Sequence, residues 1–258
     1  MTKWFEKNGP EGDVVISTRI RFARNLKSLP FPCKLKQSDK EKVNDQVIDA
    51  VLNGNMALSS RFKVIDIKSI PKYEAISLVE KHIISPQFAS DNIDSRKLLL
   101  LDDYSISIML NEEDHIKIQV FSSGLELENL KNLAVEIDEK IAEILPYATS
   151  KKYGYLTVYP TNVGTAMKAC VTLHLTALAL TGNNAKILNI INDFGMNIYS
   201  KNTQDDIYKI SNKQTLGITE EEIIKKLNVI TEKVIEQERI ARKYLAKNSI
   251  GLEDKVYR

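Results

Sequence analysis

Residues 105–120, SISIMLNEEDHIKIQV, decide the fold. Polar and apolar residues alternate over Ser105–Leu110 and again over Ile116–Val120, which is the two-residue period of half-buried β-strands. Between the two predicted strands lies Asn111-Glu112-Glu113-Asp114-His115, with three adjacent carboxylates. Three adjacent carboxylates favour the docking of a cationic group. Their position on a loop of a predicted sheet adds to this interpretation, because catalytic side chains concentrate on such loops. A charged turn that keeps a hairpin connection in water is the alternative interpretation.

The same periodicities extend outward along the chain in both directions. Further strands are predicted at Val14–Ser17, Phe62–Ile67, Leu98–Leu101, Tyr155–Tyr159, Met167–Leu175, Met196–Tyr199 and Asp206–Ile210. Helices are predicted from an N-cap at Ser38 to Gly54, from Pro71 to His82, from Leu127 to Leu145, from Asn184 to Phe194, and from the capping box Thr219–Glu222 to Lys247. Strands joined mostly by hairpins, with helices beside them, predict an α+β domain around a largely antiparallel sheet flanked by helices.

The composition limits the classes of protein to which this chain can belong. The 258 residues are 43% hydrophobic and 27% charged, as in a globular domain. Lys and Arg total 36 against 34 for Asp and Glu, so the net charge of +2 gives no case for direct nucleic-acid binding. Cys33 and Cys170 form no CxxC pair, and no apolar run has the length of a signal peptide or membrane span. We therefore expect a cytoplasmic protein that does not enter membranes.

Three arginines lie within six residues, at Arg19, Arg21 and Arg24. On an extended chain, Arg19 and Arg21 leave the same face because only Ile20 separates them. Two planar guanidinium groups side by side suit a polyphosphate. A solvated strand edge, with Ile20 and Phe22 buried between the arginines, is the alternative.

Three motifs in one order resemble the ATP:guanidino phosphotransferases, the family of creatine and arginine kinases. They are Ser17-Thr18-Arg19-Ile20-Arg21, Asn111–His115 and Pro160-Thr161-Asn162-Val163-Gly164-Thr165. Residues 19–25, 79–86 and 252–258 are similar to the bacterial protein arginine kinase branch. The resemblance implies a single creatine-kinase-like catalytic domain over residues 1–258, which lacks the branch's C-terminal domain for dimerisation and phosphoarginine sensing.

The activity that the resemblance implies is transfer of the γ-phosphoryl group of ATP, with Mg²⁺, to arginine side chains of proteins. A heat-shock repressor is expected among the substrates, and a zinc-binding activator protein and a Clp unfoldase are expected as partners. Such transfer depends on positioning and charge stabilisation.

By the same resemblance, Glu113 is the catalytic carboxylate, which orients the acceptor guanidinium and accepts its proton. Tyr159 stands beside the acceptor where the family has a cysteine. The implied nucleotide-binding residues are Ser17, Thr18, Arg19, Ile20, Arg21, His82, Lys117, Lys168, Ala169, Cys170, Val171, Thr172 and Tyr199. A helix C-terminal cap is the alternative interpretation of His82.

The predicted site departs from the family pattern at several positions. Lys117 and Lys168 stand where arginines are expected, and lysine keeps the charge but not the planar fork. Tyr199 occupies the position of an arginine at the start of the flap, and residues 205–206 are the only carboxylates left there. Two functions of different class follow: an active protein arginine kinase, and a pseudokinase that acts as a regulatory binding partner. A kinase for small free guanidines is a third hypothesis.

Overall fold

The computed structural model of the chain describes residues 2–54, 56–90, 94–182, 187, 191–202 and 206–248. The strands are β1 (Val15–Arg24), β2 (Phe62–Asp66), β3 (Lys97–Leu101), β4 (Ile106–Leu110), β5 (Ile116–Ser123), β6 (Thr149–Ser150), β7 (Gly154–Tyr155), β8 (Met167–His174), β9 (Met196–Asn202) and β10 (Ile207–Asn212). The α-helices are α1 (Gln37–Asn53), α2 (Lys72–Glu80), α3 (Leu127–Ile144), α4 (Thr176–Leu180) and α6 (Glu220–Lys247).

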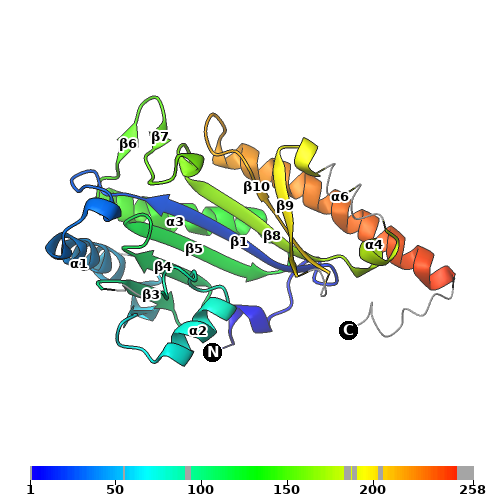
Figure 1. Ribbon diagram of the computed structural model, residues 1–258, viewed down its shortest axis with the longest axis horizontal. Helices are drawn as coiled ribbons and strands as arrows, with labels where there is room; N and C mark the ends of the chain where they lie inside the picture. The colour runs from blue at the N-terminus through cyan, green and yellow to red at the C-terminus, as the bar shows by residue number, and fades with distance from the viewer. Residues whose placement is uncertain are drawn as a thin grey trace.

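One eight-stranded sheet organises the molecule, in the order β2-β3-β4-β5-β1-β8-β10-β9. Each neighbouring pair in this sheet is antiparallel. The short strands β6 and β7 pair separately and project from one end (Figure 1). The predicted α+β class with a largely antiparallel sheet is therefore confirmed.

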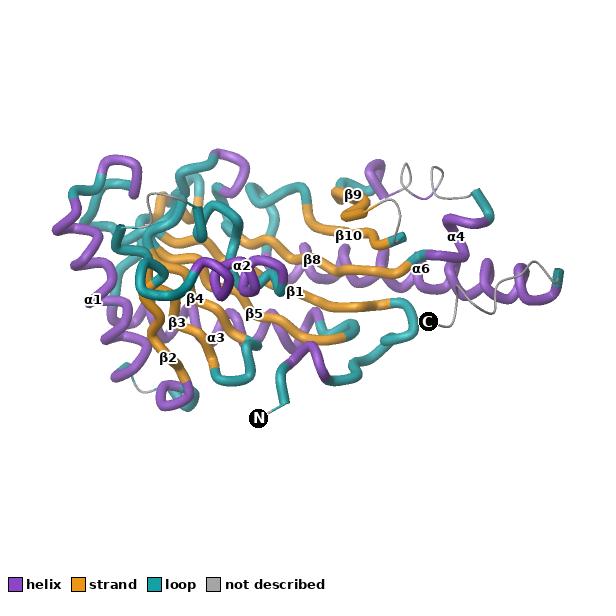
Figure 2. The backbone as a smooth tube through the Cα atoms, turned by 60° about the horizontal axis from the view of Figure 1, so that its bottom comes forward, coloured by secondary structure: helices purple, strands orange, loops and turns teal. Residues whose placement is uncertain are grey.

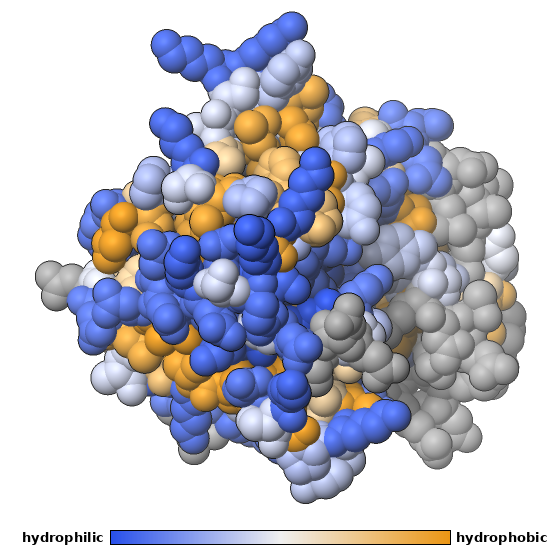
Figure 3. All heavy atoms as spheres, turned by 60° about the vertical axis from the view of Figure 1, so that its left-hand side comes forward, coloured by the Kyte–Doolittle hydropathy of each residue, from blue (hydrophilic) through white to orange (hydrophobic). Residues whose placement is uncertain are grey.

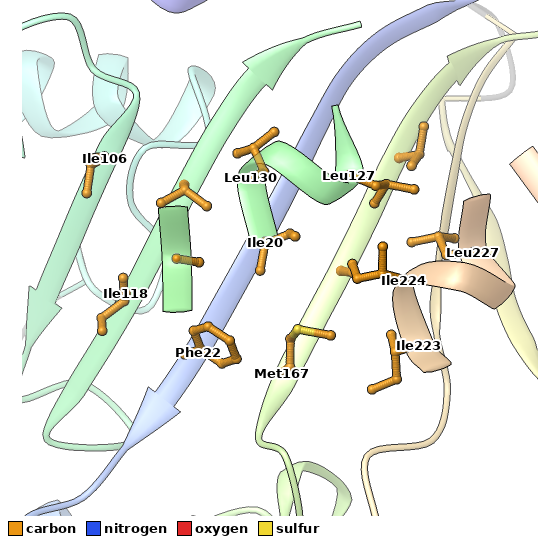
Figure 4. Packing of buried hydrophobic residues seen from close by; sticks show 14 of the residues in the cluster. Ile20, Phe22, Ile106, Ile118, Leu127, Leu130, Met167, Ile223, Ile224 and Leu227 are labelled. Carbon is orange, nitrogen blue, oxygen red and sulfur yellow. The ribbon is translucent and has the colours of Figure 1, made fainter. Parts of the chain in front are cut away.

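Alternation along β1 separates the two faces of the sheet. Ile20 and Phe22 are buried beneath α3 and α6, which run along one side of the sheet (Figure 2). Figure 4 shows Leu130 of α3 above Ile20, and Ile224 of α6 beside β8. Each such side chain stabilises the fold by about 1.5–3 kcal/mol when it leaves water. Because Ile20 and Phe22 face the helices, Arg19 and Arg21 must face the other side.

A smaller apolar cluster covers part of that other side. Ile83 and Phe88, from the segment that follows α2, pack against Leu98, Met109 and Phe121. The Trp4 ring stacks on Phe121 at a centroid distance of 5.5 Å. The cluster covers β3, β4 and part of β5, and Trp4 near the N-terminus packs against it. Among the described elements, no helix lies over the near face of β1 and β8 in Figure 1.

Three sequence predictions were wrong in detail. Strands β4 and β5 were predicted to be half-buried, but all of β4 and residues 116–121 of β5 are buried, so both faces are covered there. Helix α1 has Lys36 rather than Ser38 at its N-cap. The predicted strand Tyr155–Tyr159 is extended only at Gly154–Tyr155, because side-chain hydrogen bonds replace strand pairing after it: Asp114 accepts from the backbone N–H of Val158. The other predicted strands and helices are found, except that most of 184–190 and all of 252–258 fall outside the described residues.

The surface is mostly hydrophilic. Hydrophilic side chains cover most of the face in Figure 3, and apolar side chains form small groups between them. Within the described ranges, no helix combines the length and apolar character that a membrane crossing requires.

Candidate active site

Three central strands, β5, β1 and β8, place polar side chains on the face of the sheet opposite α3 and α6. We call this face the floor of the candidate site. Arg21 of β1 lies opposite Gln119 of β5 and Lys168 of β8, and Arg19 lies opposite Cys170 of β8. Directly opposed residues of antiparallel strands point to the same side of a sheet. On β1 and β8, the floor therefore carries three basic side chains around Cys170, namely Arg19, Arg21 and Lys168.

Strands β9 and β10 extend the floor. Lys209 of β10 lies opposite Thr172 of β8 and opposite Tyr199 of β9. Lys209, which the sequence analysis missed, thus shares the face of Arg19 and Arg21. A single lysine in a predicted strand carries no signal of its own, and only the pairing of β10 with β8 brings it to the site.

The cations of the floor also affect one another's pKa values. Burial and the charge of Arg19 lower the pKa of Arg21, and nearby Glu112 and Glu113 oppose that shift. Burial, with Arg21 and Arg19, lowers the pKa of Lys168. Mutual repulsion of this kind favours an anionic ligand, because the ligand relieves it.

The acidic turn between β4 and β5 is mostly structural. Asn111 has a φ of 60°, and its side-chain amide donates to three oxygens, among them Asn44 Oδ1 at 2.9 Å. Asp114 Oδ1 accepts from Asn25 Nδ2 at 2.6 Å and from the Val158 N–H at 2.9 Å. These bonds tie the end of β1, the turn and the loop that leads to Tyr159 into one unit.

Glu113 is the carboxylate of the turn that reaches the floor with a partly exposed side chain, at 28%. Its Oε2 lies 3.2 Å from Lys117 Nζ, and Lys117 also donates to buried Glu112. Ser85 donates to Glu112 as well. Lys117 is 3% exposed. Because it contacts both carboxylates, its charge is shared between them at the edge of the site.

His115 is a buried structural residue. Its Nδ1 accepts from the Leu26 N–H at 2.9 Å, and Nε2 lies 2.9 Å from the Pro30 carbonyl oxygen. Nδ1 is therefore the acceptor and Nε2 carries the proton. Burial lowers the pKa of His115 to about 4.

This shift predicts a loss of stability in mild acid. The pKa is lower in the folded than in the unfolded chain, so the unfolded chain binds the proton first as the pH falls from 6.5 towards 4. The free energy of unfolding should fall by about 2 kcal/mol between about pH 7.5 and about pH 5 from this residue. Urea unfolding at both pH values measures it.

His115→Gln should reduce that pH dependence, because glutamine can accept from Leu26 without titrating. Lys63→Gln is the control, since Lys63 is exposed on β2 and its replacement leaves all three histidines in place. An equal pH dependence in wild type and His115→Gln would contradict the assignment.

His82 lies at the border of the floor. It follows α2 with a φ of 60°. The next residue, Ile83, is fixed to the floor because its carbonyl accepts from Gln119 Nε2 at 3.0 Å and from Ser107 Oγ at 2.7 Å. The predicted nucleotide-binding position of His82 and the arginines thus belong to one region.

Some predicted residues do not turn their side chains to this face. Ile20, Ala169 and Val171 are buried in the core beneath the helices. Thr18 is also buried, and its hydroxyl donates to the Gly124 carbonyl at 2.6 Å. Alternation along a strand forces this, so only Ser17, Cys170 and Thr172 of these two motifs accompany the basic residues.

Arg24, the third arginine of the motif, is not in the site. It is 1% exposed, and its Nε and Nη2 donate to the Asp138 carboxylate of α3 at 2.8–3.0 Å. It also lies over the Tyr155 ring at 3.6 Å. Arg24 therefore joins β1 to α3.

The donor set of the floor fits a polyphosphate. Arg19, Arg21 and Lys168 supply several N–H donors and positive charges on one face. Within the part of the chain that the structure describes, no three His, Cys, Asp or Glu side chains cluster as a metal site. Mg²⁺ at such a site is typically held through phosphate oxygens and a few carboxylates.

Comparison with known proteins agrees with this geometry. Residues 42–241 match the family described as ATP:guanido phosphotransferase, C-terminal catalytic domain. Two solved structures share the fold: the substrate-free duplicated taurocyamine kinase of Schistosoma mansoni (TM-score 0.78, 21% identity, 91% of this chain and 35% of that one) and lombricine kinase (TM-score 0.79, 20% identity, 97% and 71%). The chain thus spans about a third of the duplicated kinase.

The chain belongs to the ATP:guanido phosphotransferase family. Within it, curated relatives carry the name protein-arginine kinase. That of Caldanaerobacter subterraneus subsp. tengcongensis is 43% identical over 252 residues, which are 95% of this chain and 74% of the relative. That of Halothermothrix orenii is 42% identical over 264 residues, or 100% and 74%.

Proposed function

We propose that this chain is an ATP-dependent protein arginine kinase of the bacterial type, acting in the cytoplasm. The observation that carries the proposal is the row of basic side chains on the face of β1 and β8 that the described helices leave open, with Glu113 at its edge. The relatives named protein-arginine kinase support the choice of substrate, which is arginine in proteins. The described residues support one catalytic domain.

The roles follow from the chemistry of phosphoryl transfer. Arg19, Arg21 and Lys168 bind the phosphates of ATP, and Mg²⁺ adds positive charge on the phosphate oxygens when it is bound. Glu113 holds the acceptor guanidinium in line and accepts the proton that its nitrogen loses as the N–P bond forms and the bond to the leaving ADP oxygen breaks. Tyr159 is proposed to border the acceptor.

A pseudokinase that regulates a partner by binding is the second candidate. The observation that favours it is the contact of Lys117 with both Glu112 and Glu113, since a paired Lys117 offers less to a phosphate and a paired Glu113 is a weaker base. Tyr199, 49% exposed, adds no positive charge at its position.

One sample distinguishes the two candidates. Titration calorimetry with Mg-ADP is followed by an assay for acid-labile phosphoarginine, with Mg-ATP and an unfolded arginine-containing protein as substrate. Binding with phosphoarginine formation is the expected result. Binding without product supports the pseudokinase, and absence of binding contradicts a nucleotide site altogether. Free arginine as acceptor tests the small-guanidine hypothesis.

Restoring the expected family side chains should raise activity. The triple variant Lys117→Arg, Lys168→Arg, Tyr159→Cys is expected to form phosphoarginine at least about tenfold faster, because planar forks bind phosphate oxygens in pairs and charged donors act strongly in a desolvated site. Lys63→Arg, on β2 at the sheet edge, is the matched control. A triple variant no faster than the control would show that other positions limit the rate.

A further inference from the structure

Lys209 shares the phosphate-binding floor with the arginines but comes from a different part of the chain. It is opposite Thr172 in β8, and Thr172 is opposite Ser17 in β1, one alternation away from Arg19. Lys209 and Arg19 are thus two strands apart and one step apart along the strands. Lysine and arginine side chains are long enough to converge over that separation.

Cys170 marks the point where they converge. Arg19 Nη2 lies 3.8 Å from Cys170 Sγ. The charges of Arg19, Lys209 and Arg21 together lower the pKa of the Cys170 thiol although its burial opposes the shift. The register of β1, β8 and β10 places one cation from β1 and one from β10 on the same face around Cys170, and these charge effects agree with that placement.

Tyr199 carries no positive charge on β9, which makes Lys209 the relevant cation on this side of the floor. It is the cross-strand partner of Lys209 in β9, on the same face. Burial raises the pKa of its phenol, so Tyr199 is neutral at physiological pH. Among the side chains described for β9 and β10, Lys209 is the one that brings a positive charge to the floor.

We propose that Lys209 binds a phosphate group of the nucleotide, together with Arg19, and so supplies from β10 the charge that Tyr199 does not supply from β9. This rests on the nucleotide site of the proposed function and adds a residue to it. Lysine acts as a point charge rather than a fork, so the ligand class is the polyphosphate chain of a nucleoside diphosphate or triphosphate.

Titration calorimetry on the full chain tests the proposal with two probes, Mg-ADP and inorganic tripolyphosphate. Lys209→Gln is expected to raise the Kd of both about tenfold, the effect of one hydrogen bond to a charged group. Lys209→Arg should bind within about threefold of wild type, because the charge is kept. Lys213→Gln, exposed just after β10, is the matched control and should bind like wild type.

Thermal unfolding of each variant establishes that the fold is kept. If wild type binds Mg-ADP and Lys209→Gln binds it equally well, the role of Lys209 is overturned while the proposed function stands. If Lys209→Gln weakens Mg-ADP but not tripolyphosphate, the contact is not with phosphate and the proposal fails. If wild type binds neither probe, the nucleotide site and Lys209's role fail together.

Discussion

Glu113→Gln is expected to lower the rate of phosphoarginine formation by two to four orders of magnitude, the range in which general-base catalysis contributes. Glutamine keeps the size of the side chain but can neither accept the proton of the acceptor nitrogen nor balance the guanidinium charge. Single-turnover formation of phosphoarginine measures the loss. Binding of Mg-ADP should persist, because the substitution removes a negative charge 3.2 Å from Lys117.

Glu136→Gln is the matched control for this substitution. Glu136 is exposed on α3, on the helix side of the sheet, so its variant should phosphorylate at the wild-type rate. Full activity in Glu113→Gln would remove Glu113 from the chemistry. Lost Mg-ADP binding in the same variant would place Glu113 in the nucleotide site instead.

Arg24→Met should destabilise the fold by about 3–5 kcal/mol, because it leaves the buried Asp138 carboxylate without its partner. Asp138 is 5% exposed and accepts three hydrogen bonds from Arg24. The same arginine satisfies the carbonyls of Ala23 at 2.9 Å and Thr165 at 3.1 Å. Urea unfolding followed by circular dichroism measures the change.

Arg239→Met provides the matched control. Arg239 also forms a two-point contact with a carboxylate, Asp13, but both side chains are more than 40% exposed. An exposed pair contributes about 0–1 kcal/mol, so this variant should lose little. The double variant Arg24→Met, Asp138→Leu should recover much of the lost stability, since it removes the unpaired charge. A loss below about 1 kcal/mol in Arg24→Met would contradict a structural role.

The arginine motif shows which features of the site could be predicted from the sequence and which could not. Alternation around Ile20 correctly placed Arg19 and Arg21 on one face, because the direction of side chains along a strand is a local property. The same alternation puts Arg24 on the face of Ile20 and Phe22, but the motif gave no sign of its partner in α3. Its partner Asp138 is distant in sequence, and a buried ion pair of this kind leaves no local pattern.

The acidic turn shows the same difference between what is local in the sequence and what depends on distant segments. Its position between two strands was predicted correctly, and the structure assigns the five residues different tasks. Asn111, Asp114 and His115 bind backbone and side chains from other segments, Glu112 pairs with Lys117, and Glu113 reaches the floor. A count of carboxylates cannot separate these tasks, since each depends on which segment folds against the turn.

The sequence by itself determined the α+β class, the positions of the long helices and most strands, and the family motifs, because the periods of strands and helices, caps and short motifs are encoded by neighbouring residues. It did not predict the short elements α4 and β6. Only the tertiary structure decided which polar side chains share the floor. Strand pairing brought Lys209 and Tyr199 to the face that carries Cys170, and the packing of α3 against β1 gave Arg24 its partner Asp138. These outcomes depend on register between distant segments, which is fixed by burial of the whole sheet face.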